Sequence, residues 1–93
     1  MNEDRIKPIL DELGIKPTDN WQTIHVYRPN VNDTCYYYAF EHKGKTYCVS
    51  GDSYSLVFSK DNPKGFFPKM LYQGYNLKEL REVIKKVVSK WNT

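Results

Sequence analysis

Two runs rich in β-branched and aromatic residues, 34–42 and 45–50, are separated by only two residues, Lys43-Gly44. A two-residue connection that contains glycine is typical of a tight antiparallel hairpin. Since side chains alternate between the two faces along a strand, a slip of one residue would exchange the faces. The large apolar side chains that share one face in this register are Tyr36 and the pairs Phe40–Tyr47 and Tyr38–Val49. The sequence therefore predicts a sheet with one apolar face that the rest of the chain must cover.

Amphipathic segments on both sides of the hairpin predict two helices that cover this face. Residues 4–13 have apolar side chains at helical spacing, with Asp4 as the expected N-cap and Gly14 as the stop. A longer helix begins after Asn76, and Glu79, three residues on, completes a pair similar to a capping box. The apolar stripe of this second helix consists of Leu77, Leu80, Ile84, Val87, Val88 and Trp91.

Three further segments are candidate strands. Residues 21–27 alternate between two faces, and we expect residues 31–33 to form a polar loop before the hairpin. Gly51-Asp52-Ser53 is a predicted turn, and residues 54–59 form a second β-rich run. Pro68 argues against a central strand in 66–73, which we expect to be an edge strand or an irregular aromatic loop. We therefore expect a single α+β domain over residues 1–93. It has an N-terminal helix, an antiparallel sheet of three to four strands (five if 66–73 is extended) and a long C-terminal helix packed on one sheet face.

Positive charge is concentrated in the last third of the chain. Residues 1–59 contain six Lys or Arg against eight Asp or Glu, whereas residues 60–93 contain eight against three, for a net charge of +3. Such a layout attracts phosphate backbones and makes nucleic-acid binding the second hypothesis. The alternative is that lysines on a solvent-facing helix side serve solubility, which the ratio of eleven Lys to three Arg favours. The candidate nucleic-acid-binding residues are Lys78, Arg81, Lys85, Lys86 and Lys90.

The cysteines and histidines do not form a metal-binding or catalytic motif. In the predicted hairpin Cys48 lies opposite Ala39, so Cys35 is displaced by four residues, or roughly 13 Å. That separation exceeds the reach of a disulfide or of shared metal coordination. His25 and His42 have no ligand partner at a metal-like spacing. The sequence therefore predicts no catalytic residues, no metal and no cofactor, and an enzyme is the least favoured of the three function classes.

Aromatic residues make up 15% of the chain, and the segment 66–72 is rich in them. Aromatic and methionine side chains on a loop are typical anchors of protein interfaces. The alternative is that they close one end of the core. The leading hypothesis is a non-catalytic interaction module that binds another protein or itself, through a sheet edge or through this segment. The candidate protein-binding residues are Phe66, Phe67, Met70 and Tyr72.

Hydropathy and amino-acid composition add expectations about the location and source of the protein. The acidic, polar start is unlike a signal peptide, and no stretch approaches the roughly 20 apolar residues of a membrane span. We therefore expect a cytoplasmic protein with no membrane partner. The many Lys, Asn, Tyr and Ile residues are the bias of an A/T-rich coding sequence, as in many low-GC bacteria and their phages.

Overall fold

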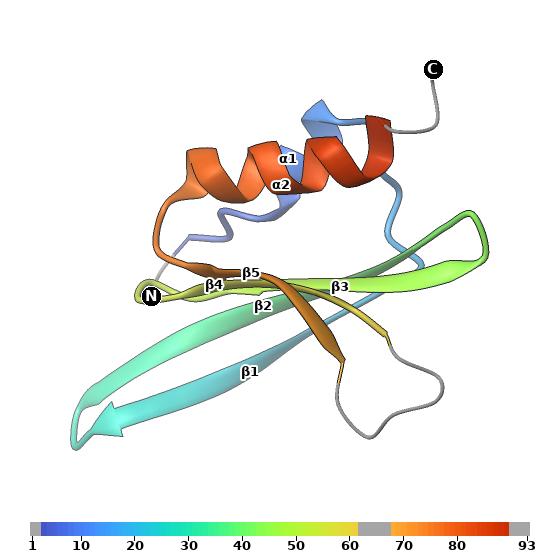
Figure 1. The fold of residues 1–93 in the computed structure, drawn as a ribbon. Helices are drawn as coiled ribbons and strands as arrows, with labels where there is room; N and C mark the ends of the chain where they lie inside the picture. Colours follow the sequence, from blue (N-terminus) through green and yellow to red (C-terminus); the bar gives the residue numbers. More distant parts are fainter. Residues whose placement is uncertain (1–2, 62–67, 90–93) are drawn as a thin grey trace.

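The Lys43-Gly44 hairpin joins two strands of a five-stranded antiparallel sheet, and two helices lie over one face of that sheet (Figure 1). The computed structural model describes residues 3–61 and 68–89. The strands follow one another in chain order across the sheet, from β1 at one edge to β5 at the other. The elements are α1 (Lys7–Glu12), β1 (Asp19–Arg28), β2 (Val31–His42), β3 (Lys45–Gly51), β4 (Leu56–Lys60), β5 (Lys69–Gly74) and α2 (Leu77–Ser89). The α+β class expected from the sequence is confirmed.

The register of the β2–β3 hairpin agrees with the sequence prediction. Phe40 pairs with Tyr47, and Tyr38 pairs with Val49. The turn residue Lys43 has a φ of 50° and Gly44 has a φ of 75°. Positive φ at both central residues is the type I′ geometry that matches the twist of the flanking strands.

A second two-residue hairpin joins β1 to β2, and here the sequence prediction was wrong. We expected a polar loop between the first strand and the hairpin, but β2 begins at Val31, directly opposite Arg28. The turn needs only two residues because Asn30 adopts a φ of 65°, which asparagine tolerates better than most side chains. The consequence is a long β1–β2 ribbon whose far end extends beyond the helices (Figure 1).

The core lies between the helices and the apolar sheet face. Phe58 is fully buried in it, and its ring stacks at 6.1 Å from that of Phe40 and at 5.8 Å from that of Tyr47. The remaining buried residues of the core are Ile6, Ile9, Leu10, Tyr38, Val49, Leu56, Leu80 and Ile84. No helix among the described residues is long and apolar enough to cross a membrane.

The first helix is shorter than the sequence predicts. Asp4 does act as a cap, since its Oδ1 accepts hydrogen bonds from the backbone N–H groups of Ile6 and Lys7. The helical residues begin only after this bend, which leaves Pro8 in the first turn where its missing N–H costs nothing. Gly14 ends the segment with a φ of 72°.

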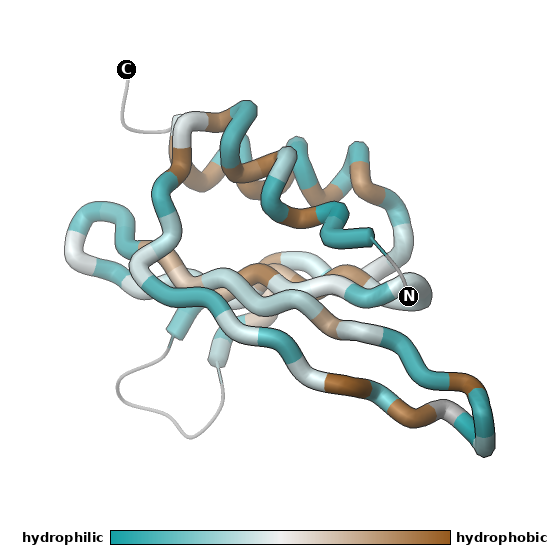
Figure 2. Tube along the Cα trace, turned by 180° about the vertical axis from the view of Figure 1, so that it is seen from behind, coloured by the Kyte–Doolittle hydropathy of each residue, from teal (hydrophilic) through white to brown (hydrophobic). Residues whose placement is uncertain are grey.

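The far end of the β1–β2 ribbon leaves apolar side chains uncovered. Ile24 is 62% exposed and Val26 is 68% exposed, although both lie on the face of the sheet that the helices cover elsewhere. Figure 2 shows these apolar positions on the projecting ribbon, away from the helices. The expectation that the helices cover the whole apolar face therefore holds for the centre of the sheet but not for this ribbon.

The start of α2 is capped by three side chains in place of the expected two. Asn76 Oδ1 accepts hydrogen bonds from the N–H groups of Lys78 and Glu79, as an N-cap does. The Glu79 carboxylate does not reach back to the Asn76 N–H. The Tyr72 hydroxyl lies between them, accepting from the Asn76 N–H at 3.3 Å and donating to Glu79 Oε1 at 3.1 Å. Strand β5 and α2 are thereby joined through one phenol.

Candidate functional site

Two strands and a turn bring an imidazole, a thiol and a carboxylate together at one end of the sheet. His25 comes from β1, Cys35 from β2 and Asp52 from the turn that follows β3. The register explains the meeting, because Thr23 pairs with Cys35 and His25 lies two residues further along the same face of β1. Cys35 alternates along β2 with Tyr36 and Tyr38, which pack in the core beneath the helices, so the cluster lies on the opposite face of the sheet.

Asp52 organises the tight turn between β3 and β4. It is 1% exposed, and its Oδ1 accepts from the N–H groups of Tyr54 and Ser55, each at 2.8 Å, and from the Ser55 hydroxyl at 3.4 Å. The turn can sit this close to the core because Gly51 precedes it. A Cβ at Gly51 would lie 2.7 Å from Leu56 Cδ2. The sequence reasoning identified this turn but not the carboxylate buried within it.

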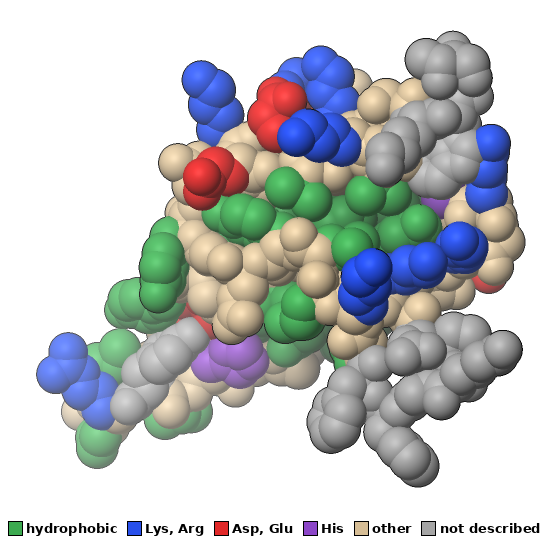
Figure 3. Space-filling view, viewed as in Figure 1, with side chains coloured by type: hydrophobic (Ala, Val, Ile, Leu, Met, Phe, Trp, Pro, Cys, Tyr) green, Lys and Arg blue, Asp and Glu red, His purple; other side chains and the backbone are tan. Residues whose placement is uncertain are grey.

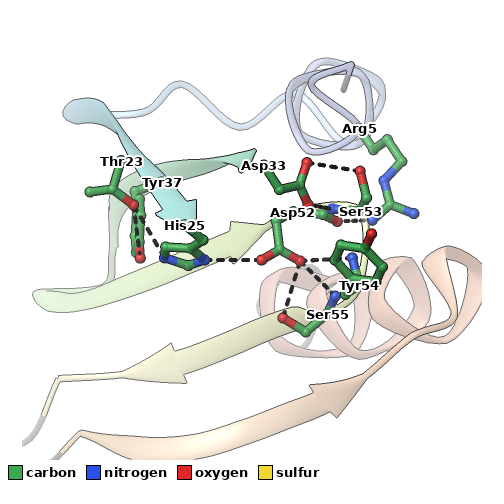
Figure 4. A network of polar contacts seen from close by, with 9 residues as sticks. All are labelled: Arg5, Thr23, His25, Asp33, Tyr37, Asp52, Ser53, Tyr54 and Ser55. Atoms are coloured by element: carbon green, nitrogen blue, oxygen red, sulfur yellow. Dashed lines mark hydrogen bonds and ion pairs between the residues drawn. The ribbon is translucent and has the colours of Figure 1, made fainter. Parts of the chain in front are cut away.

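His25 connects this turn to the edge strand β1. Its Nδ1 lies 3.0 Å from Asp52 Oδ2, and its Nε2 lies 3.4 Å from the Thr23 hydroxyl. Thr23 in turn donates to the hydroxyl of Tyr37 at 3.5 Å, and the Tyr37 ring stacks on Trp21 with centroids 5.2 Å apart. Both ring nitrogens therefore face polar groups of the protein (Figure 4).

A second buried carboxylate lies beside the first. Asp33 pairs with His25 across the β1–β2 ladder and accepts from the Ser53 N–H at 2.6 Å and from the Ser53 hydroxyl at 3.0 Å. Arg5, just before α1, donates to the backbone carbonyl of Asp52. Two carboxylates with little access to water make this end of the sheet electronegative, which favours a cation nearby.

The thiol of Cys35 is 4% exposed and is not an activated nucleophile. Burial raises its pKa, the Tyr37 hydroxyl opposes that rise, and the nearby Asp52 and Asp33 carboxylates add to it. Burial likewise raises the pKa of Cys48. A thiol with a raised pKa remains protonated at neutral pH, so the cluster lacks the lowered thiol pKa that a cysteine nucleophile needs.

The structure separates the described members of the predicted protein-binding segment. Met70 is 50% exposed on the edge strand β5, whereas Tyr72 is half-buried and holds the cap of α2. Phe66 and Phe67 lie outside the described residues. Tyr72 is thus explained by its structural contacts, and Met70 is the described member of the set that presents an exposed apolar side chain.

The predicted nucleic-acid-binding residues do not form a uniform basic face. Arg81 binds both oxygens of Glu12 on α1, at 3.0 and 2.7 Å, and also Glu82 at 3.1 Å. This pairing lowers the pKa of Glu12 and raises that of Arg81. Lys78, Lys85 and Lys86 are exposed on α2, and Lys90 lies outside the described residues. Arg81 is therefore already engaged with acidic partners.

A lysine cluster lies at the other end of the sheet. Lys60 on β4 pairs with Lys69 on β5, and Lys45 lies on the same face of β3. The neighbouring Lys45 ammonium lowers the pKa of Lys60, and Lys69 adds to that effect. Figure 3 shows basic side chains gathered at the β2–β3 end of the sheet, below the apolar surface of the core.

Comparisons with models of protein families, with curated protein sequences and with solved structures find no match to this chain. The fold places it in the class of small α+β domains, with a five-stranded antiparallel sheet and a helix at each end of the chain.

Proposed function

We propose that this domain is a cytoplasmic, non-catalytic protein-binding module that pairs edge to edge with a second copy of itself through β1. The observation that carries the proposal is the exposure of Ile24 and Val26 on an edge strand. An edge strand presents unpaired backbone N–H and C=O groups, and exposed apolar side chains beside them favour the addition of another strand.

The composition of β1 supports such pairing. Natural sheet edges are commonly protected by lysine or proline within the strand. The Lys, Arg, Asp and Glu residues of β1 are only Asp19 and Arg28, at its two ends. A register shift between Val26 and Arg28 bends the last part of the strand and leaves the preceding residues in regular register.

A second copy is the occupant that the charges favour. Because Asp19 begins the strand and Arg28 ends it, antiparallel pairing of two copies brings opposite charges close together. A two-fold axis at Ile24 places this residue against its own copy, with Val26 opposite Gln22. The apolar side chains of both copies then meet on one face, as isologous association requires.

Sedimentation velocity over a range of concentrations tests the proposal. We expect the wild-type weight-average mass to rise towards that of two chains, and we expect Ile24→Lys to abolish the rise without loss of folded structure. Met70→Lys, on the opposite edge, is the matched control and should behave as wild type. A monomer at all concentrations, or a dimer lost only in Met70→Lys, contradicts pairing through β1.

The lysine cluster favours a second candidate function, nucleic-acid binding at the end of the sheet. Bringing Lys45, Lys60 and Lys69 together costs electrostatic free energy that a polyanion relieves. Fluorescence anisotropy with single- and double-stranded DNA and RNA should then show binding that weakens steeply with salt. Lys60→Glu should reduce it more than Lys78→Glu on α2 does. If Lys78→Glu reduces binding more than Lys60→Glu does, the nucleic acid binds to α2 and not to the lysine cluster. If no nucleic acid binds even at low salt, nucleic-acid binding is excluded.

A further inference from the structure

We propose that His25, Cys35 and Asp52 together bind one zinc ion. Each offers one ligand atom of a different kind, an imidazole nitrogen, a sulfur and a carboxylate oxygen, and these atoms all lie within 4.8 Å of one another. The three residues come from three separate segments of the chain and meet at one end of the sheet. Figure 4 shows two of them, His25 and Asp52, directed at one another.

The ligand spacing suits a small tetrahedral ion. Zinc binds nitrogen and oxygen at about 2.0–2.2 Å and sulfur at about 2.3 Å, so tetrahedral ligand atoms are about 3.3–3.6 Å apart. His25 Nδ1 and Asp52 Oδ2 are 3.0 Å apart and need to separate by only a few tenths of an ångström. The Cys35 sulfur lies within 4.8 Å of the other two ligand atoms, and a change in its side-chain torsion brings it closer to them.

The surrounding hydrogen bonds orient the ligands as metal sites require. Asp52 Oδ1 is held by the turn N–H groups, which leaves Oδ2 directed at His25. Nδ1 faces the Asp52 carboxylate at 3.0 Å, so a metal ion replaces the proton that these two atoms share. The displaced proton leaves to solvent, and the ring stays neutral with an Nε2–H that donates to the Thr23 hydroxyl. A ligating histidine almost always has such a partner.

The mixture of ligands decides which metal fits. A thiolate disfavours magnesium and calcium, which prefer oxygen ligands, whereas zinc accepts sulfur, nitrogen and oxygen together. The buried Asp33 beside the cluster adds negative charge that stabilises a divalent cation. On binding, the Cys35 thiol loses its proton to solvent as the sulfur–zinc bond forms.

The position of His25 determines how the ion reaches the site and what its binding does to the sheet. Its side chain is 39% exposed, whereas that of Asp52 is buried, so the ion enters from the His25 side and its fourth position faces solvent. Because the ligands join β1, β2 and the β3–β4 turn, the ion ties the edge strand to the centre of the sheet. Metal binding should therefore restrict the motion of the projecting β1–β2 ribbon relative to the rest of the sheet.

Titration of metal-free, untagged protein with Co²⁺ tests the site directly, since cobalt replaces zinc and gives visible absorption. We expect one equivalent to bind, with a thiolate-to-cobalt charge-transfer band that Zn²⁺ abolishes by displacement. Cys35→Ala should lose that band, whereas Cys48→Ala, the matched control on the other free cysteine, should retain it. Folding of each variant is checked by far-ultraviolet circular dichroism.

His25→Gln keeps the test decisive if Cys35→Ala fails to fold. We expect this variant to weaken Co²⁺ binding by more than about tenfold, and Thr23→Val to weaken it by about tenfold through the loss of the ring partner. No charge-transfer band in the wild type at excess Co²⁺ overturns the proposal. So does a band lost in Cys48→Ala, or an affinity that His25→Gln leaves unchanged.

Discussion

Replacement of Asp52 tests whether its carboxylate holds the β3–β4 turn together. Asp52→Ala removes the acceptor of two backbone N–H groups at 2.8 Å and of the Ser55 hydroxyl at 3.4 Å. Hydrogen bonds to a charged acceptor contribute about 1.5–3 kcal/mol each. Tyr54 is exposed, so its N–H can bond to water in the variant, and its bond to Asp52 is taken at the lower value of this range. The pair with His25 is discounted because that ring is partly exposed. We expect Asp52→Ala to lower the free energy of unfolding by about 3–4 kcal/mol, which is a large part of the 5–15 kcal/mol typical of a domain.

Asp52→Asn separates the hydrogen bonds from the charge. Its amide oxygen still accepts from the turn N–H groups, so we expect a loss of only about 1 kcal/mol. Urea unfolding followed by circular dichroism measures both variants, and Asp61→Ala, at an exposed aspartate after β4, is the control that should change stability little. A loss below about 1 kcal/mol for Asp52→Ala, or equal losses for Ala and Asn, refutes the assignment of the turn to these bonds.

Three further predictions concern the core, the cap of α2 and the contact between the helices. Phe58→Ala should cost about 3–5 kcal/mol in urea unfolding because its ring is fully buried in the aromatic stack. Tyr72→Phe should cost about 0.5–1.5 kcal/mol, since the Asn76 N–H loses its acceptor, and an unchanged midpoint contradicts the role of the phenol. The Arg81 guanidinium lowers the pKa of Glu12, so its contribution to stability is present above the ordinary carboxyl pKa and is lost as the pH falls through the lowered value. Thermal unfolding of Glu12→Gln should therefore respond less to acidification than that of wild type.

The parts of the fold that local chemistry determines were predicted from the sequence. The Lys43-Gly44 turn fixes its own register, and that register placed Phe40 opposite Tyr47 before any tertiary contact was considered. Asn76 was likewise predicted as the cap of α2, because the capping side chain and the N–H groups it binds are neighbours in sequence.

The parts that depend on pairing between distant segments were not predicted. Treating residues 31–33 as a loop hid the register of β1 against β2, and without that register His25 could not be placed beside Cys35. The sequence offered one indication, the alternation of side chains along each strand, which places Thr23, His25 and Cys35 on the face opposite to the core. Asp52 was read as turn material, and nothing in the sequence alone distinguishes a buried turn carboxylate from a solvated one.

The two proposals make a joint prediction, because His25 lies between Ile24 and Val26 on the strand proposed to pair. In the Ile24-centred register, His25 of one copy is opposite Thr23 of the other, which is also the residue beside its own ring. A zinc ion that fixes His25 reduces the conformational entropy that β1 loses on pairing, so it should strengthen self-association. By linkage, self-association should raise the zinc affinity by the same factor. Sedimentation velocity with and without zinc measures the change in self-association. Cobalt titration at low and high protein concentration measures the change in metal affinity. His25→Gln should abolish the effect of zinc while leaving metal-free association intact. If zinc binds but leaves association unchanged, β1 is already ordered and the site serves the stability of the single chain.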